Sequence, residues 1–112
     1  MVNERFEKMR GELRRGTLIL AVLLALREEE YGYSLRGKMQ DVGLDIEEST
    51  LYPLIRRLET QGLLSSHWSE TDGGRKRRYY KTSEAGLRIL EDLLSELESI
   101  NTSIEQLNTP SS

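Results

Sequence analysis

The chain has 112 residues, of which 37% are hydrophobic and 31% are charged, and this size and balance predict one domain with a single hydrophobic core. It contains no cysteine and one histidine, which excludes disulfides and thiol chemistry and argues against a histidine-based catalytic or metal site. No signal peptide is evident and the apolar run of residues 18–26 is too short to cross a bilayer, so we expect a soluble cytoplasmic protein without cofactors or membrane contact.

Residues 3–26 predict the first helix. Its opening turns are dense in charge, whereas residues 17–26 are apolar nearly all round, as expected of an element inside the core. A glycine within a helix weakens it, so a kink or break near Gly16 is an alternative to one continuous helix. The three glutamates at positions 28–30 then predict a solvated turn.

Residues 31–42 predict a second helix, which begins either at Ser34 or at the Tyr-Gly turn before it. Helical spacing directs one set of its side chains toward the core: Leu35, Met39 and Val42. The opposite face is expected to meet solvent: Arg36, Lys38 and Gln40. Gly43 marks the end of this helix, and a short acidic connection follows.

A third helix is predicted over residues 49–61, with Ser49 as its N-cap and Gly62 as the left-handed residue after its end. Leucine and isoleucine recur at helical spacing and mark a buried face: Leu51, Leu54, Ile55 and Leu58. The remaining surface carries Thr50, Tyr52, Arg56 and Arg57. Two helices joined by a short connection describe a helix-turn-helix, and the polar face of the second would suit a DNA major groove. An ordinary surface helix has the same pattern, so the neighbouring elements must decide.

The pattern then changes to the alternation of a β-strand over residues 64–69, followed by a turn at 71–74 and a returning strand over 75–82. We expect Arg77 and Tyr79 on one face of the returning strand and Tyr80 on the other. The aromatic residues of this hairpin are interpreted as anchors to the helices, with stacking on single-stranded bases as the alternative: Trp68, Tyr79 and Tyr80. His67 is expected to be a strand-surface residue.

The net charge of −3 conceals an uneven distribution. Residues 49–82 contain seven Lys or Arg and three Asp or Glu, whereas residues 83–112 contain one Lys or Arg and six Asp or Glu. A basic hairpin that follows a helix-turn-helix is typical of a wing, whose cations meet DNA phosphates or the minor groove. The local field, rather than the total charge, decides where a polyanion binds. A simpler interpretation is that these basic side chains are only solvated.

The last predicted helix covers residues 83–108, with Ser83 as N-cap and Glu84 in the first turn. Leucine and isoleucine form a stripe at spacings of three and four: Leu90, Leu93, Leu94, Leu97, Ile100, Ile104 and Leu107. A helix of about 25 residues is about 37 Å long, more than so small a domain can cover. We therefore expect a homodimer, and the alternative is a helix that folds back on the first helix alone.

This order of elements resembles the PadR family of transcriptional regulators, in its short form with one C-terminal helix. The resemblance rests on five segments and spans most of residues 15–90: 31–33 (YGY), 49–59 (STLYPLIRRLE), 62–64 (GLL), 73–80 (GGRKRRYY) and 82–86 (TSEAG). It implies a fold that is mainly α with a small β-hairpin. Residues 1–82 would form a winged helix-turn-helix, residues 83–108 a dimerisation helix and residues 109–112 a disordered tail.

The resemblance also implies double-stranded DNA as partner, with operator binding that usually represses transcription and is relieved by an unidentified small molecule or another signal. The third helix would supply contacts to the major groove or its flanking phosphates: Ser49, Thr50, Tyr52 and Arg56. The wing would supply Arg75, Lys76 and Arg77. Additional candidates for backbone contacts precede or lie on the second helix: Tyr31, Ser34 and Lys38.

One departure concerns the effector, because some short members stack flat aromatic drugs between tryptophans of the final helix. That helix has no aromatic residue in this chain, and its counterpart neighbourhood around Leu97 is aliphatic. Multidrug binding is therefore not expected, and the inducer is undefined. A winged-helix module that binds an acidic protein is the alternative function. An enzyme is disfavoured because no nucleophile–base set, metal cluster or phosphate loop is present.

Overall fold

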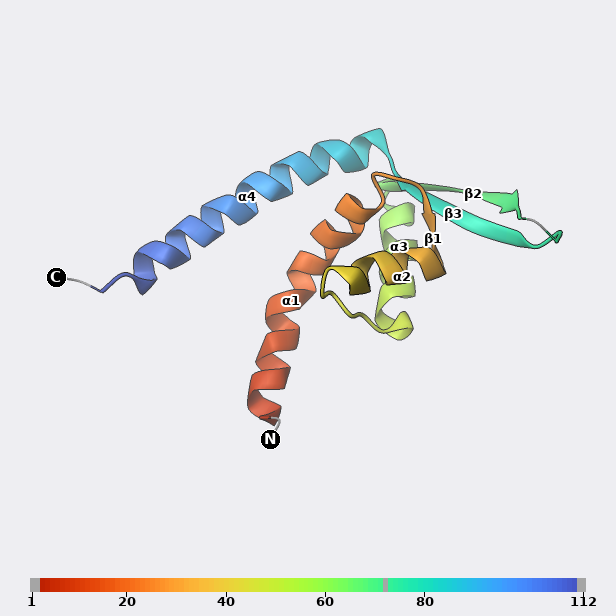
Figure 1. Cartoon of the computed structure of the whole chain (residues 1–112). Coiled ribbons are helices and arrows are strands. Elements are labelled where there is room, and N and C mark those ends of the chain that lie inside the picture. Colours follow the sequence, from red (N-terminus) through yellow and green to blue (C-terminus); the bar gives the residue numbers. More distant parts are fainter. Residues whose placement is uncertain (1–2, 72, 111–112) are drawn as a thin grey trace.

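The computed structural model describes residues 3–71 and 73–110, which form helices around a small antiparallel sheet (Figure 1). The elements in chain order are α1 (Glu4–Ala25), β1 (Glu30–Tyr31), α2 (Gly32–Asp41), α3 (Glu48–Thr60), β2 (Leu64–Glu70), β3 (Lys76–Thr82) and α4 (Glu84–Asn108). This confirms the predicted fold class, mainly α with a hairpin wing. Parts of the predicted turn, tail and first domain lie outside the described residues: Met1, Val2, Asp72, Ser111 and Ser112.

Helix α1 is one continuous helix, so the break considered at Gly16 does not occur. Asn3 caps its start, because the Asn3 side chain accepts hydrogen bonds from the backbone N–H groups of Arg5 and Phe6 at 3.0 and 3.2 Å. The buried residues of α1, Leu20, Val22 and Leu23, all lie near its C-terminal end, whereas its first half extends away from the other elements (Figure 1). The helix therefore has one end inside the core and one end exposed.

The core lies where α1, α2, α3 and the root of α4 meet. Its largest fully buried side chains are Leu23, Leu26, Leu35, Met39, Leu51, Ile55 and Leu58. The predicted anchor face of α3 is thus confirmed, as are the inward positions on α2 except for one. Val42 is 71% exposed, because α2 ends at Asp41 and the chain turns at Gly43 with φ +84°.

Helix α3 begins one residue earlier than predicted. Its N-cap is Glu47, whose backbone carbonyl accepts the first helical hydrogen bond from Leu51 at 2.9 Å. Ser49 therefore lies in the first turn rather than at the cap, and its hydroxyl is 3.5 Å from a Glu47 carboxylate oxygen. The reason is tertiary: Ile46 is buried, which anchors the chain just before the helix and sets its starting point.

The sheet has the strand order β1-β3-β2, and β1 was not predicted. The glutamate turn expected at residues 28–30 ends in a strand, because Glu30 pairs with Tyr80 and Tyr31 pairs with Tyr79. A two-residue strand is too short to carry an alternating pattern, so its sequence contains no signal for it.

The predicted faces of β3 are confirmed. Tyr79 lies on the same side as Tyr31 and His67, whereas Tyr80 packs against the core on the other side. Tyr80 therefore anchors the hairpin to the core as expected. Tyr79 makes an edge-to-face contact with Tyr31 at 5.6 Å between ring centroids, so it joins the hairpin to β1 rather than to a helix. The interpretation was wrong for Trp68, which is 61% exposed.

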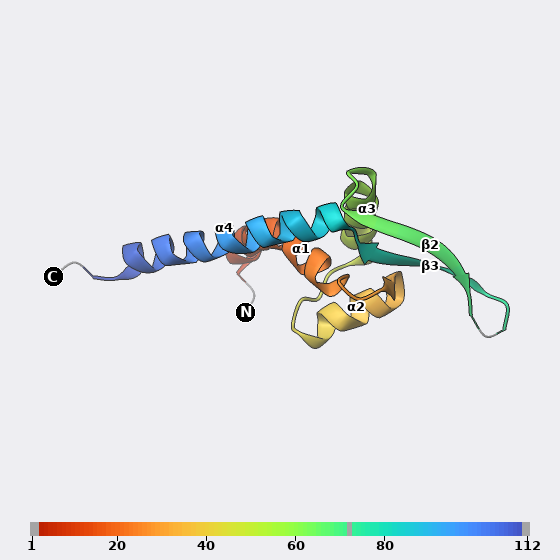
Figure 2. The same ribbon diagram turned by 90° about the horizontal axis from the view of Figure 1, so that it is seen from above.

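Helix α4 begins where β3 ends, and Ser83 caps it by accepting a hydrogen bond from the Gly86 N–H at 3.0 Å. From this junction α4 and the hairpin extend in nearly opposite directions (Figure 2). Leu90 is buried and Leu93 and Leu97 are half-buried, but the stripe becomes progressively exposed and Leu107 reaches 86%. Among the described residues, no helix combines the length and apolar character that a membrane crossing requires.

Candidate nucleic-acid interface

The outward face of α3 carries three exposed residues of the predicted set: Ser49, Thr50 and Arg56. Tyr52 differs from them because its ring is half-buried against the start of α2. A Cβ atom on Gly32 would lie 2.8 Å from Cε1 of Tyr52, closer than such contacts come. The glycine thus leaves the space in which the Tyr52 ring lies, and the two helices together set the position of that ring.

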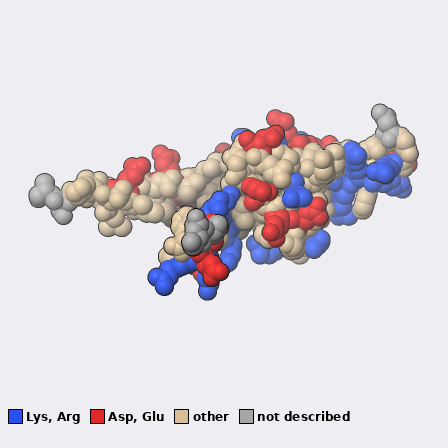
Figure 3. Space-filling model, turned by 60° about the horizontal axis from the view of Figure 1, so that its bottom comes forward, with Lys and Arg blue, Asp and Glu red and all other residues tan. Residues whose placement is uncertain are grey.

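The wing is the hairpin of β2 and β3, and its cations are concentrated near its end. Gly73 and Gly74 have φ values of +92° and +78°, which L residues with side chains rarely adopt. The Thr71 N–H donates to the Arg75 carbonyl at 2.7 Å and closes the turn. Arg75 and Lys76 are exposed there, and Figure 3 shows Lys and Arg side chains gathered along this part of the molecule.

Arg77 has a defined position, unlike a solvated cation. Its guanidinium carbon lies 4.3 Å from the centroid of the Tyr31 ring, within the range of a cation–π contact. Tyr31 in turn contacts Tyr79 edge-to-face and is nearly parallel to Tyr33, with 6.4 Å between those ring centroids. The short strand β1, which places Tyr31 beside β3, is therefore what holds this arginine.

Arg78 points to the opposite face of the hairpin and joins it to α3. Its guanidinium donates to Oε2 of Glu59 at 3.1 Å and to the Ser66 hydroxyl at 3.1 Å. The Ser66 hydroxyl also donates to Glu59, and this hydrogen bond together with the Arg78 charge holds the pKa of Glu59 below its ordinary value of 4.5. One of the four consecutive basic residues thus fixes the wing to the helix.

The candidates on and before α2 make internal contacts. The Ser34 hydroxyl accepts from the Tyr31 N–H at 3.1 Å and donates to the Tyr31 carbonyl at 3.0 Å, so it caps the helix. Lys38 donates from Nζ to the Ala25 carbonyl at 2.9 Å and lies in the wall of a different cavity. The fold therefore brings Tyr52 and Arg56 of α3 and Arg77 of the wing to one surface, whereas Lys38 lies at a different cavity.

A hollow of about 330 Å³ lies between the start of α2, the outward face of α3 and the strands of the wing. Its walls include aromatic rings and guanidinium groups, chiefly Tyr33, Tyr52, Trp68, Arg56, Arg77 and Arg78. The sequence-based candidates for duplex contacts do not include Tyr33 or Trp68, and Trp68 enters only as the alternative of stacking on single-stranded bases. Neither has a local sequence signal for this position, because the hollow forms from three segments that are distant along the chain.

His67 lies outside this hollow and pairs with Glu29 at the end of the loop before β1. The contact with the Glu29 carboxylate raises the pKa of His67 above 6.5. The imidazole also stacks on Tyr79, with 5.8 Å between centroids. Among the described residues, no group of three His, Asp or Glu side chains could hold a metal ion.

Comparisons with known proteins agree with this geometry. The family model "Transcriptional regulator PadR-like family" matches residues 19–92. The transcriptional regulator Rv3488 from Mycobacterium tuberculosis is 34% identical over 90 residues, which cover 80% of this chain and 83% of that protein.

Two solved structures extend the likeness to the whole fold. A PadR family transcriptional regulator from Eggerthella lenta is 42% identical, with a TM-score of 0.89 and 96% of each chain covered. A PadR-like transcriptional regulator from Bacillus cereus is 27% identical, with a TM-score of 0.80 and coverage of 89% of this chain and 99% of that one. The winged-helix architecture is therefore shared along nearly the entire chain.

Proposed function

Because this chain belongs to the PadR-like family of transcriptional regulators, we propose that it is a sequence-specific DNA-binding repressor, which acts as a homodimer and is released by a small molecule. The observation that supports the proposal is that Tyr52 and Arg56 of α3 and Arg77 of the basic wing line one hollow. A regulator of this family is not an enzyme, so the function lies in binding.

On DNA, α3 would enter the major groove, where Ser49, Thr50, Tyr52 and Arg56 would meet base edges or flanking phosphates. Three wing cations would contact the neighbouring backbone: Arg75, Lys76 and Arg77. Two copies related by a two-fold axis would read half-sites about one helical turn apart, so the operator should be pseudo-palindromic. Occupation of such a site would repress the gene that it precedes.

Two unpaired apolar strips support the dimer. One lies on the exposed half of α1 and contains Phe6, Met9 and Leu13; the other continues along α4 through Ile100, Ile104 and Leu107. In Figure 1 the helices that carry them diverge from a common region, so each strip has room for a partner helix. Helix α1 carries five basic and three acidic residues, whereas α4 carries one basic and six acidic residues. An α4 packed on the partner's α1 would therefore bury both strips between helices of opposite charge.

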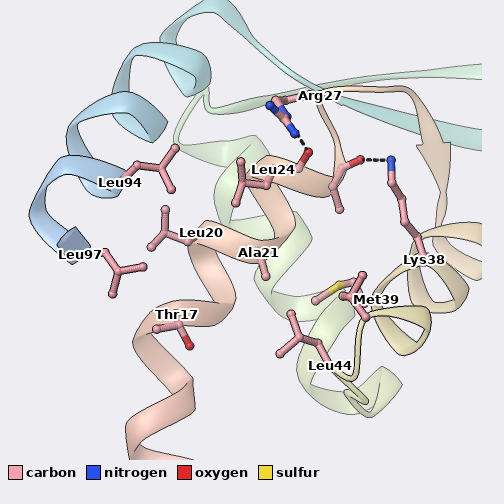
Figure 4. Close-up of a pocket in the computed structure, with 12 residues that line it drawn as sticks. Thr17, Leu20, Ala21, Leu24, Arg27, Lys38, Met39, Leu44, Leu94 and Leu97 are labelled. Atoms are coloured by element: carbon pink, nitrogen blue, oxygen red, sulfur yellow. Dashed lines mark hydrogen bonds between the residues drawn. The ribbon is translucent and has the colours of Figure 1, made fainter. Parts of the chain in front are cut away.

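A cavity of about 360 Å³ between α1, α2 and α4 supports a small-molecule effector. Figure 4 shows its leucine walls, with Leu94 and Leu97 of α4 facing Leu20 and Leu24 of α1. These walls suit an aliphatic rather than a flat aromatic molecule. Arg27 and Lys38 lie at the other side, where they donate to the carbonyls of Leu24 and Ala25. An acidic group on the effector would compete for these cations at the end of α1.

The test is the salt dependence of binding to DNA from upstream of the chain's own gene. Each phosphate that the protein neutralises releases counterions, which gives a slope of about −0.9 in log affinity against log salt. We expect a slope of several such units. A flat dependence, or no retardation of any genomic fragment at low salt, contradicts the proposal and favours a protein-binding winged helix.

A further inference from the structure

We propose that the hollow between α2, α3 and the wing seats one phosphodiester of the DNA backbone, together with the deoxyribose beside it. The inference rests on the proposed DNA binding and names a discrete site within it. It assigns contact roles to Tyr33 and Trp68, and it separates Arg77 from the cations at the end of the wing.

The charge of the hollow selects an anion. Three guanidinium groups line it, from Arg56, Arg77 and Arg78. Arg78 is paired with Glu59 and so contributes little net charge, but Arg56 is exposed and Arg77 rests on an uncharged ring. None of the described residues that line the hollow is acidic. A net charge near two positive units in a concave site favours a phosphate group.

Arg77 is the group best prepared to bind that phosphate. A flexible cation loses side-chain freedom when it binds, and this loss reduces affinity. Arg77 stacks on Tyr31, which itself contacts Tyr33 and Tyr79, and this stacking already restricts the Arg77 side chain. Its planar guanidinium can donate two parallel hydrogen bonds to phosphate oxygens. Arg75 and Lys76 are exposed on the hairpin and supply a more diffuse attraction.

The aromatic walls match the sugar next to the phosphate. Tyr33 is 78% exposed and Trp68 is 61% exposed, so both leave large apolar surfaces in water. A deoxyribose placed between them would cover part of these surfaces. Tyr52 and Arg56 of α3 border the hollow. If α3 lies in the major groove, the hollow meets the sugar–phosphate backbone at the edge of that groove, so the aromatic rings contact the sugar rather than a base.

The experiment uses the shortest upstream duplex that the wild-type chain retains, with single methylphosphonate linkages introduced one at a time. A methylphosphonate removes the charge of one phosphate. For the wild type, we expect one position in each half-site to weaken binding about tenfold, as expected for the loss of one charge-assisted hydrogen bond. In Arg77→Ala that position should lose its effect, and the salt slope should decrease by about one unit.

Matched variants separate the site from the rest of the wing. Lys76→Ala should weaken binding but keep the wild-type methylphosphonate pattern. Arg77→Lys should restore the sensitive position in part, which also excludes a folding defect as the cause. Tyr33→Leu and Trp68→Leu should weaken binding several-fold with an unchanged salt slope.

The outcomes distinguish failure of the proposed phosphodiester site from failure of the proposed DNA binding. If the wild type binds DNA with a steep salt slope but Arg77→Ala keeps every methylphosphonate effect, the proposed site is wrong and the proposed function stands. If Arg77→Ala and Lys76→Ala change the pattern alike, the site is again overturned. If the wild type binds no DNA, both inferences fail together.

Discussion

Glu59 at the end of α3 and Arg78 in the middle of β3 form an ion pair, with 3.1 Å between Oε2 and the guanidinium nitrogen. The Ser66 hydroxyl of β2 hydrogen bonds to both partners. This cluster joins the helix that would read DNA to both strands of the wing. Side chains from three segments therefore hold α3 and the wing together.

The Glu59 cluster predicts a loss of stability in acid. The hydrogen bond from Ser66 and the charge of Arg78 lower the folded-state pKa of Glu59, so its contribution is complete above pH 4.5 and disappears as the pH falls through the lower folded value. Urea unfolding should show Glu59→Gln less stable than the wild type by about 1 kcal/mol at pH 7. The difference should shrink below pH 4. Glu70→Gln, on the same hairpin, serves as control, and an equal loss in both variants would contradict this assignment.

His67 should titrate above its ordinary pKa. The Glu29 carboxylate raises the folded-state value, so the contact stabilises the fold below pH 6.5 and its contribution is lost as the pH rises through the raised pKa. His67 is the only histidine in the chain, so its imidazole resonance in an NMR titration is unambiguous. Glu29→Gln should return the pKa toward 6.5, whereas Glu28→Gln should leave it raised. An unchanged pKa of His67 in the Glu29→Gln variant would disprove the pairing of His67 with Glu29.

Gly32→Ala should alter DNA binding with little effect on stability. The new methyl group would push against Cε1 and the hydroxyl of Tyr52, which is the mobile end of a side chain, so the ring should move aside. Tyr52→Ala should change the DNA sequence preference, because the Tyr52 ring would contact the major groove. We expect a similar change for Gly32→Ala, measured by selection of bound DNA fragments. The double variant Gly32→Ala with Tyr52→Ala should have the same sequence preference as Tyr52→Ala alone. Gly37→Ala is the control, because nothing lies within 4 Å of its Cβ position; additive effects in the double variant would refute the coupling.

Gly86→Ala should be strongly destabilising. A Cβ atom there would collide with the Leu63 carbonyl oxygen and lie 2.7 Å from Cγ2 of Thr82, and backbone cannot move aside cheaply. Overpacking of this kind costs about 1–3 kcal/mol, which thermal unfolding would detect. The Gly37→Ala variant should instead be stabilised slightly, by about 0.5–1 kcal/mol. Equal stability of Gly86→Ala and the wild type would show that α4 can shift at its root.

Ile100→Glu combined with Ile104→Glu should dissociate the proposed dimer. Both side chains belong to the exposed stripe of α4, and a charge placed in an apolar helix interface is unfavourable without a partner. Sedimentation velocity at micromolar concentration should then show monomers, whereas Gln106→Glu should remain dimeric. A monomeric wild type under the same conditions would overturn the dimer itself.

Local rules explain why so much of the fold followed from the sequence. The 3.6-residue spacing of Leu51, Leu54, Ile55 and Leu58 defines a buried face whatever the neighbours are, and those residues are buried. Ser83 caps α4 and Gly62 adopts φ +79° because capping depends on the chemistry of one or two residues. The basic hairpin and the long apolar stripe were likewise visible as uninterrupted patterns.

Where contacts join distant segments, the sequence alone was insufficient. The start of α3 moved to Glu48 because Ile46 is anchored in the core, and the glutamate turn became β1 because β3 had an edge to pair with. Arg77 and Arg78 are neighbours in sequence, yet one rests on Tyr31 and the other pairs with Glu59.

The sequence by itself thus determined the four helices and the hairpin in their order, the buried face of α3 and the position of the positive charge, because each depends on periodicity or composition within one segment. The tertiary structure alone decided which arginine stacks on Tyr31 and which pairs with Glu59, which aromatic residue stays exposed and which glycine accommodates Tyr52. Those outcomes depend on the distance between atoms that are far apart along the chain, and no local pattern encodes that distance.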